Sequence, residues 1–351
     1  MASSRVSCQI SECRITPPIE RTETAKGAVP PLIVRTLGVK NEGDDLRFGI
    51  RELSLEDPLI ELPEEELGLL RRSRSSFIAH LDIEEKIDLV LENFAEYERE
   101  LLSLTLRRAL FWDLSYSSFI SDINLINRRL ANLLTTGRLY IDQVQHDVQA
   151  VYGVGHSTLQ SLKAKLKEEY DSTLGYRVME ALRNHIQHRG LPIHGVNYPN
   201  RRDDSSGRRS LKWRIAPYLS VDALREDKDF KKPVLRERQS RGAKVVVTPL
   251  VREYVESIGR THEHLRDLCS KDMAEWTQQL EGLIERGRVV LDENLGGVAL
   301  VAEDGSGNCI HSEQVFTDLL DRYKFLKNKN LALKHISLHF VSGEYIEGES
   351  E

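Results

Sequence analysis

Apolar residues recur every three or four positions through four long stretches of this sequence, the spacing that gathers them on one face of an α-helix. The first stretch opens at Asp82, which we expect to be its N-cap, and carries acidic residues early, where the helix dipole favours them. Its apolar positions are Ile83, Ile87, Val90, Phe94, Tyr97, Leu101 and Leu104. The second stretch begins near Ser118 and ends at the glycines of YGVGHST. Both stretches predict long amphipathic helices.

The third stretch runs from Thr158 to His188, and we expect a kink near Gly175. The fourth begins at Thr248, with Pro249 at the first helical position, where proline is well tolerated. Long amphipathic helices that follow one another bury their apolar faces together. The sequence therefore predicts a mainly α fold, an antiparallel helical bundle with a basic insert and small flanking segments of β and α+β structure.

The segments around the helices suggest four regions. Residues 1–30 are polar, and we expect them to be disordered. Residues 31–80 read as a small β-rich segment that ends in a short helix and a basic linker. The helical domain covers 82–287, and a small α+β segment covers 288–351 with a helix near 313–328. Whether the strands of the two flanking segments pack together is left open by the sequence.

Composition excludes several classes of protein. No run of eighteen apolar residues is present, so we expect no membrane span, and the first residues lack the apolar core of a secretory signal. The four cysteines are too dispersed for a disulfide framework or a paired zinc motif. A metal site on Cys8, Cys13 and a distant histidine is the weaker alternative. We expect free thiols, a cytoplasmic protein, and no metal or cofactor.

A basic insert at about 195–247 interrupts the helical domain. Residues 201–244 contain 14 Lys and Arg residues and only 7 Asp and Glu residues, although the whole chain has a net charge of −6. Such a separation of charge is costly unless the basic part faces an anion or is solvated. The phosphate backbone of RNA is the anion we expect. The residues expected to contact the phosphates are Arg201, Arg202, Arg208, Arg209, Lys212 and Arg214. Trp213 is the candidate RNA-binding residue that would stack on a base, and packing within the insert is its alternative role.

The stretch ALRNHIQHRGLPIHG, residues 181–195, combines arginines and histidines at the end of a predicted helix. An arginine and a following histidine with four to six residues between them occur at Arg74 and His80, Arg183 and His188, and Arg189 and His194. We expect the first pair to lie in a linker, and the third spans Gly190 and Pro192, which stop the helix. Only Arg183 and His188 are then held on one helical turn.

Helical geometry relates the residues of this turn. Asn184 and His188 are four apart and share a face. Arg183 is offset from His188 by about 140° on an ideal helix, so its side chain must reach around or act in a partner subunit. The carbonyl dipoles at a helix C-terminus favour a protonated imidazole. Leu182 and Ile186 continue the apolar face.

Arginine, asparagine and histidine together suit phosphodiester chemistry on RNA. A histidine takes the proton of a 2′-hydroxyl or returns one to the leaving 5′-oxygen. An arginine stabilises charge that develops on the phosphoryl oxygens, and an amide orients one of these groups. The alternative interpretation is a polar helix end that only solvates its terminus.

The sequence LRNHIQHRGLPIHG resembles the signature of the HEPN superfamily, and SVDALREDKDFKKPVL and TPLVREYVESIGRTHEHLRDL are similar to a bacterial subgroup of it. The resemblance covers about 82–287. It implies a homodimer in which two motifs form one composite site, with Arg183 and His188 as the catalytic pair and Asn184 as the polar residue beside them. Many members are metal-independent endoribonucleases of toxin–antitoxin or antiviral systems that leave a 2′,3′-cyclic phosphate. Others bind RNA or nucleotides without cutting, or act as scaffolds.

Other histidines and arginines remain to be assigned. His185, Arg189 and His194 lie beside the motif and are candidate auxiliary residues. We expect His262 and His264 to lie on a helix surface, and His335 and His339 to share one face of an edge strand. The resulting hypothesis is an RNA-cleaving homodimer, with an antitoxin or other regulatory partner. A non-catalytic RNA- or nucleotide-binding protein or scaffold is the alternative.

Overall fold

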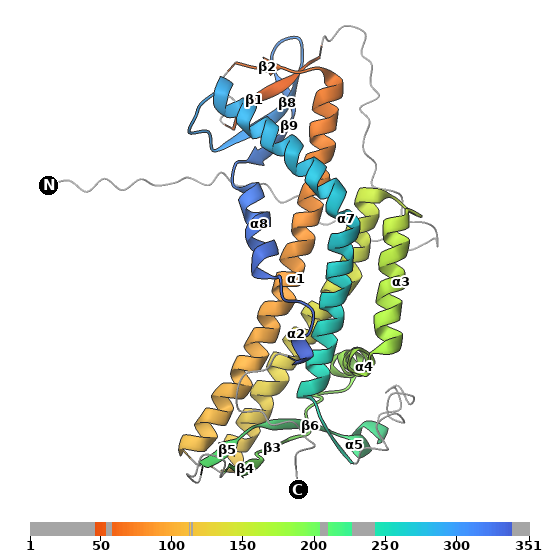
Figure 1. Ribbon diagram of the computed structural model, residues 1–351, viewed down its shortest axis with the longest axis vertical. Helices are drawn as coiled ribbons and strands as arrows, with labels where there is room; N and C mark the ends of the chain where they lie inside the picture. The colour runs from red at the N-terminus through yellow and green to blue at the C-terminus, as the bar shows by residue number, and fades with distance from the viewer. Residues whose placement is uncertain are drawn as a thin grey trace, which may run out of the picture. The chain divides into compact units, whose positions relative to one another are not determined.

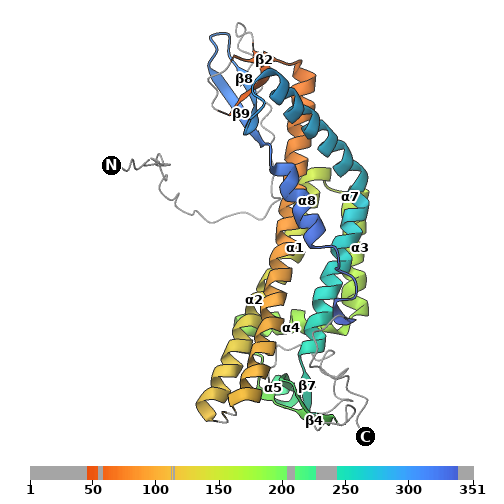
Figure 2. The ribbon, with the colours of Figure 1, turned by 60° about the vertical axis from the view of Figure 1, so that its left-hand side comes forward.

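The computed structural model describes residues 46–53, 58–111, 113, 115–203, 210–226 and 243–338. In these residues the protein is mostly helical and has small antiparallel sheets (Figures 1 and 2). The helical bundle consists of α1 (Glu64–Phe111), α2 (Tyr116–Tyr152), α3 (Ser157–Ser172), α4 (Leu174–His188) and α7 (Thr248–Val290). The prediction of a mainly helical chain is confirmed.

The apolar faces read from the sequence form the core of the bundle. Helices α1 and α2 run antiparallel along each other, and α7 packs on α1, α3 and α4 (Figure 1). Tyr97, Tyr140 and Tyr254, one from each of the three longest helices, are at most 1% exposed. Burying a large apolar side chain contributes roughly 1.5–3 kcal/mol, so these faces hold the bundle together.

Helix α1 begins at Glu64, well before the predicted start at Asp82. The stretch predicted as a short helix and a basic linker is continuous with the long helix. Leu67, Leu70 and Phe77 extend the apolar face toward the N-terminus and are buried. Pro63 precedes the helix, and three glutamates occupy its first turn, where the helix dipole favours acidic side chains. The linker prediction was wrong because apolar spacing continues through its charged residues.

The third predicted helix is two helices. Thr173 adopts an extended conformation between α3 and α4, so the predicted kink near Gly175 is a break two residues earlier. Gly175 lies so close to α7 that a Cβ atom there would be 2.6 Å from the Leu250 carbonyl oxygen. Its backbone N–H donates to Glu253 Oε2 at 2.9 Å. The break lets the start of α4 approach α7 closely.

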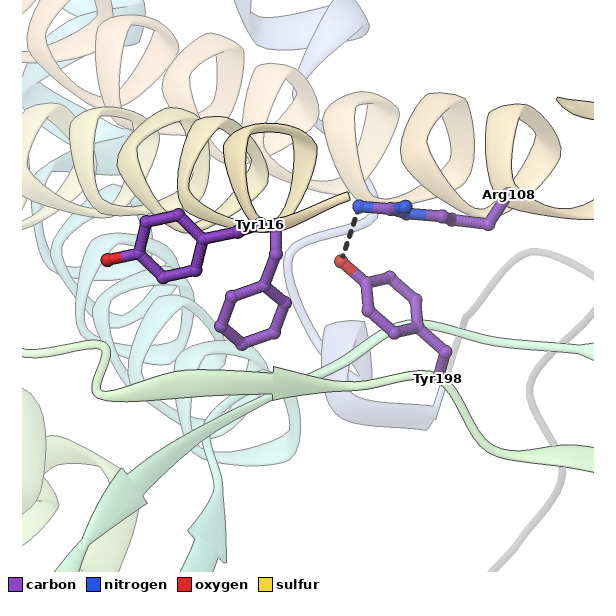
Figure 3. Close-up of a pocket in the computed structure, with 4 residues that line it drawn as sticks. Arg108, Tyr116 and Tyr198 are labelled. Atoms are coloured by element: carbon purple, nitrogen blue, oxygen red, sulfur yellow. Dashed lines mark hydrogen bonds between the residues drawn. The ribbon is translucent and has the colours of Figure 1, made fainter. Parts of the chain in front are cut away.

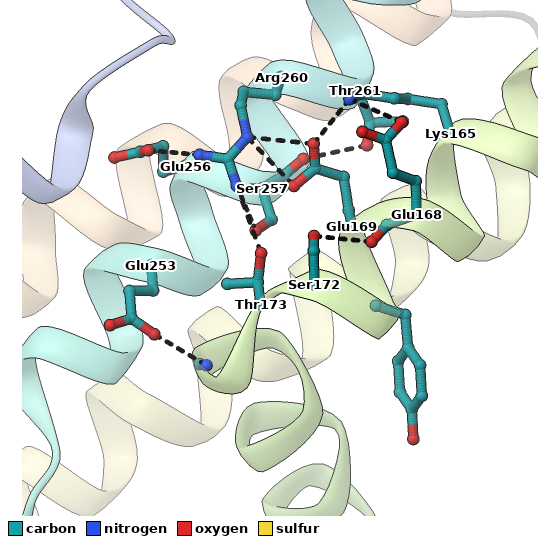
Figure 4. A network of polar contacts seen from close by, with 12 residues as sticks. Lys165, Glu168, Glu169, Ser172, Thr173, Glu253, Glu256, Ser257, Arg260 and Thr261 are labelled. Carbon is teal, nitrogen blue, oxygen red and sulfur yellow. Dashed lines mark hydrogen bonds and ion pairs between the residues drawn. The ribbon is translucent and has the colours of Figure 1, made fainter.

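A buried carboxylate fastens α3 to α7 (Figure 4). Glu169 of α3 is 3% exposed and accepts hydrogen bonds from Arg260 of α7, at 2.6 Å from Nη2 to Oε2. Lys165 lies 3.0 Å from the same carboxylate. Burial alone would raise the pKa of Glu169, but the hydrogen bonds from Arg260 and Lys165 outweigh it and lower the pKa. The network fixes α3 beside α7.

The flanking segments do pack together. Strands β1 (Arg47–Glu52), β2 (Ile60–Glu61), β8 (Gly297–Glu303) and β9 (Cys309–Phe316) form one antiparallel sheet in the order β2-β1-β8-β9. Ile50 pairs with Leu300, and both are buried. Strands β1, β8 and β9 lie within the stretches LRFGIREL, GVALVAE and CIHSEQVF. Residues 31–45 of the segment predicted to be β-rich, like residues 1–30, for which disorder is expected, lie outside the described residues.

The C-terminal segment differs from its prediction. The helix expected at 313–328 is α8 (Leu319–Lys329), because β9 extends to Phe316. The strand expected from Lys334 is replaced by a short 3₁₀ helix, η1 (Ile336–Leu338). His335 has a φ of +73°, which turns the chain, and Ser337 N–H donates to Glu256 Oε2 at 2.7 Å. The shared strand face of His335 and His339 is therefore wrong, and His339 itself lies outside the described residues.

The described residues of the insert form small sheets and one short helix at the end of the bundle where α4 ends and α7 begins (Figure 1). Strands β3 (Gly195–Asn197), β6 (Ala216–Ser220) and β7 (Lys244–Val246) form one sheet, and β4 (Asn200–Asp203) pairs with β5 (Ser210–Trp213) as a hairpin. A short helix, α5 (Val221–Glu226), follows β6. Among the described helices, none is both long and apolar enough to cross a membrane.

Candidate functional site

The predicted motif occupies the last two turns of α4. Leu182 is fully buried, which fixes the inner face of the helix. Asn184 and His188 are exposed, and Arg183 is half-buried. Arg183 Nη1 donates to Asn184 Oδ1 at 3.2 Å. The helix ends at His188, as the Gly-Pro stop predicts.

Arg183 and His188 are not joined in one chain. Within the described part of the protein, no hydrogen bond links the two side chains, and the contact of Arg183 is with the neighbouring Asn184. This agrees with the angular offset of residues five apart on a helix. A reaction that needs both groups on one phosphate therefore requires Arg183 to rotate or a second chain to supply one group.

The loop after the motif is anchored to α2. The Asn127 side chain accepts a hydrogen bond from Ile193 N at 2.9 Å and donates to Ile193 O at 3.3 Å. Asn127 and Ile193 are 1% and 3% exposed. This paired contact fixes the chain directly after the Gly-Pro stop.

A buried carboxylate anchors the motif helix from its other side. Glu180 lies one turn before Arg183 and accepts from Arg138 Nη1 of α2 at 3.0 Å. Tyr254 of α7 donates to the other oxygen of Glu180 at 3.4 Å. Glu180 thereby joins α4 to α2 and α7, and together with Asn127 it sets the position of the exposed turn.

The auxiliary candidates have different surroundings. His194 Nδ1 accepts from Ser220 N–H at 3.3 Å, and the backbone N–H of His194 donates to Tyr218 O at 3.2 Å. Burial, with the nearby His185 as a second cause, lowers the pKa of His194. His194 is therefore held against β6 by these two contacts. His185 is half-buried, Arg189 is exposed, and both make contacts of their own.

Among the expected RNA contacts, those that the structure describes lie on or beside the β4–β5 hairpin. Arg202 and Lys212 are exposed, whereas Trp213 and Arg214 are half-buried and, like Lys212, make contacts of their own. Lys212 and Trp213 are consecutive on β5, so their side chains point to opposite faces of the hairpin. Of the other expected RNA contacts, Arg208, Arg209 and the side chain of Arg201 lie outside the described residues.

The pair Arg74 and His80 is not in a linker. Both lie on α1, so the reason for setting the pair aside was wrong. They nevertheless diverge: Arg74 Nε donates to Gln314 O at 2.6 Å, while the buried His80 packs its ring 5.1 Å from that of Trp276. The structure brings no reactive pair together there.

His262 was predicted to lie on the surface but is 1% exposed. Its Nδ1 is 3.0 Å from Tyr140 Oη, and its Nε2 lies 3.3 Å from Glu84 Oε2 without the geometry of a hydrogen bond. Arg266 donates to both oxygens of Glu84, at 2.8 and 2.5 Å. His262 is a core residue because two other helices, α1 and α2, supply the polar groups around it. His264 is half-buried and contacts Ser161.

Metal ligands are not gathered in the described parts of the chain. No group of three His, Cys, Asp or Glu residues there is arranged to hold a metal ion. Cys269 is buried and Cys309 exposed, and both are free thiols as predicted. Cys8 and Cys13 lie outside the described residues.

The residues that position the motif were missed by the sequence analysis. Asn127 is a polar residue beside Ile126 and Leu130 in an otherwise apolar helix face, and such a position signals a buried polar contact. Glu180 carries the same signal, one turn before the motif. Neither pattern could name the partner. No protein-family model matches this sequence, and no curated protein or solved structure is significantly similar to it.

Proposed function

We propose that this protein is a metal-independent endoribonuclease of the HEPN type that acts as a homodimer. The observation that carries the proposal is the exposed turn of α4, where Asn184 and His188 face solvent beside Arg183. The anchors at Glu180 and Asn127 support it, because catalysis requires its groups to be held in place. The same proposal places the protein in the cytoplasm. It also assigns the protein to a toxin–antitoxin or antiviral system, with an antitoxin or other regulatory partner.

The roles follow from the chemistry of the side chains. His188 takes the proton of the ribose 2′-hydroxyl or returns one to the 5′-oxygen, and its exposure allows RNA to reach it. Arg183 stabilises the charge on the phosphoryl oxygens, and Asn184 orients the arginine through the bond they share. The 2′-hydroxyl is the nucleophile, so the products are a 2′,3′-cyclic phosphate and a 5′-hydroxyl.

The dimer accounts for the separation of the two groups. Within one chain, Arg183 and His188 are five positions apart on α4, and an offset of about 140° on an ideal helix directs them to different sides. Two copies that meet at this turn bring Arg183 of one chain to His188 of the other. Basic residues of the β4–β5 hairpin, such as the exposed Arg202, would guide the RNA backbone.

The proposal is tested by incubating purified protein with end-labelled RNA in the presence of a chelator. Wild type is expected to cut, and His188→Ala and Arg183→Ala are each expected to lose about 10²–10⁴-fold in rate. His146→Ala, at an exposed histidine on α2, is the matched control and should cut normally. Wild type that binds RNA without cutting it would instead support a non-catalytic RNA-binding protein.

A further inference from the structure

An open cavity lies beside the turn between α1 and α2, facing the chain that follows β3. Its volume is about 310 Å³, and its lining consists of Arg108, Tyr116, Phe119 and Tyr198 (Figure 3). Three of these four residues are aromatic. The cavity is at the lower end of the range of about 300–1,000 Å³ that small-molecule sites occupy.

The one charged group of the lining is held rigidly. Arg108 and Asp122 have side chains only 5% and 2% exposed, and Asp122 Oδ2 accepts from Arg108 Nε at 3.0 Å and from Nη2 at 2.6 Å. Tyr198 donates its hydroxyl to the same oxygen at 2.7 Å. The Arg108 guanidinium also lies 4.7 Å from the centre of the Tyr198 ring. These contacts fix the guanidinium at the cavity wall.

The hydrogen bonds of this guanidinium to described residues involve two of its three nitrogens. Arg108 Nη1 has no hydrogen bond with any residue that the structure describes, whereas Nε and Nη2 are both bonded. A ligand in the cavity can therefore accept a hydrogen bond from Nη1. Because Asp122 already balances the charge of Arg108, the site favours a neutral acceptor over a phosphate.

The aromatic residues define the shape of the ligand. Tyr116 is 80% exposed, and Phe119 and Tyr198 are each half-buried with part of the ring open to the cavity. Rings of this kind offer flat apolar faces on which another flat ring stacks. A flat ring that also carries a carbonyl oxygen or ring nitrogen as acceptor fits both features of the site.

We propose that this cavity binds an unstacked nucleobase, which stacks on the aromatic lining and accepts a hydrogen bond from Arg108 Nη1. Tyr198 follows the motif helix in the same connecting segment, at the end of the bundle where α4 ends. A base bound here would hold a single strand near the motif. That last role rests on the proposed ribonuclease function, whereas base binding does not.

The test uses oligodeoxynucleotides, which lack the 2′-hydroxyl and so cannot be cut by the proposed reaction. The binding of a fluorescent single-stranded oligonucleotide is compared with that of an abasic strand of equal length and charge. Wild type is expected to bind the strand with bases more tightly. Tyr116→Ala should weaken binding of that strand roughly tenfold and leave the abasic strand unaffected. Tyr116→Phe keeps the ring and should bind like wild type.

Phe325→Ala, which removes an exposed ring on α8 outside the cavity, is the matched control and should leave both affinities unchanged. Competition with a free mononucleotide separates the two sources of a base. Competition at similar concentrations identifies a free nucleotide as the ligand, and its absence identifies a base within a strand. Equal binding of the two strands, or wild-type binding by Tyr116→Ala, would overturn the proposal even if RNA cleavage were observed.

Discussion

Asn127 on α2 holds the backbone of Ile193 by two hydrogen bonds, accepting from its N–H at 2.9 Å and donating to its carbonyl at 3.3 Å. The side-chain amide of Asn127 bonds to both backbone polar groups of the buried Ile193, as a neighbouring β-strand would. The contact joins α2 to the loop that follows the motif helix. The end of α4 is therefore fixed by tertiary structure as well as by its own sequence.

The first prediction concerns this contact. Asn127→Ala leaves the N–H and C=O of Ile193 buried without their partner, and we expect a loss of about 1–3 kcal/mol in the free energy of unfolding. Urea unfolding followed by circular dichroism measures the loss. Asn132→Ala, at an exposed position on the same helix, should change stability by less than about 0.5 kcal/mol. Equal effects of the two variants would contradict the assignment.

The second prediction compares two helical glycines. Gly175→Ala places a Cβ 2.6 Å from the Leu250 carbonyl oxygen. Because moving a backbone atom of α7 costs energy, we expect a loss of about 1–3 kcal/mol in the free energy of unfolding. Gly282→Ala meets nothing within 4 Å and should stabilise α7 by about 0.5–1 kcal/mol. Thermal unfolding of the two variants should give shifts of opposite sign. A stabilised Gly175→Ala would show that α4 does not approach α7 so closely.

The third prediction concerns acid. Burial alone would raise the pKa of Glu84, but hydrogen bonds from Arg266 and the proximity of His262 outweigh burial and lower the pKa to about 2. A carboxylate with a lowered pKa stabilises the fold above its unfolded value of 4.5, and this contribution disappears as the pH falls toward 2. We expect wild type to lose on the order of 3 kcal/mol from Glu84 across this interval.

Urea midpoints measured between pH 6 and pH 2 test this prediction. Glu84→Gln has no carboxyl group to protonate, so its stability should be lower at neutral pH and depend less on pH in the acid range. Glu285→Gln, which removes an exposed carboxylate on α7, should keep the wild-type pH profile. A Glu84→Gln profile parallel to that of wild type would show that Glu84 does not carry the acid sensitivity.

The sequence predicted the helices where the signal is local. Apolar spacing located the cores of α1, α2 and α7, and the Gly-Pro stop located the end of α4, because each depends on neighbouring residues. The start of α1 was missed because its charged stretch resembles a linker, although Ser73 and His80 within it are buried by contacts with distant helices. Local pattern cannot report such contacts.

In the candidate site, too, the features set by neighbouring residues could be predicted, and those set by distant contacts could not. The exposure of Asn184 and His188 beside the buried Leu182 followed from helical spacing. The burial of His262 did not, because its partners Tyr140 and Glu84 come from other helices and only folding brings them together. The aromatic cavity could not be predicted from the sequence either, because Tyr198 and Arg108 are far apart in the chain and only folding brings them together.

The most direct test of the ribonuclease proposal mixes two inactive variants. Arg183→Ala and His188→Ala are each expected to cut RNA about 10²–10⁴-fold more slowly than wild type, because neither homodimer has both groups facing one another. After subunit exchange of equal amounts, half of the dimers are mixed, and each regains one of the two Arg183–His188 pairs of the wild-type composite site. Cleavage should then return to roughly a quarter of the wild-type rate. A mixture that stays inactive although mixed dimers form, or either variant cutting RNA alone at the wild-type rate, would contradict the composite site.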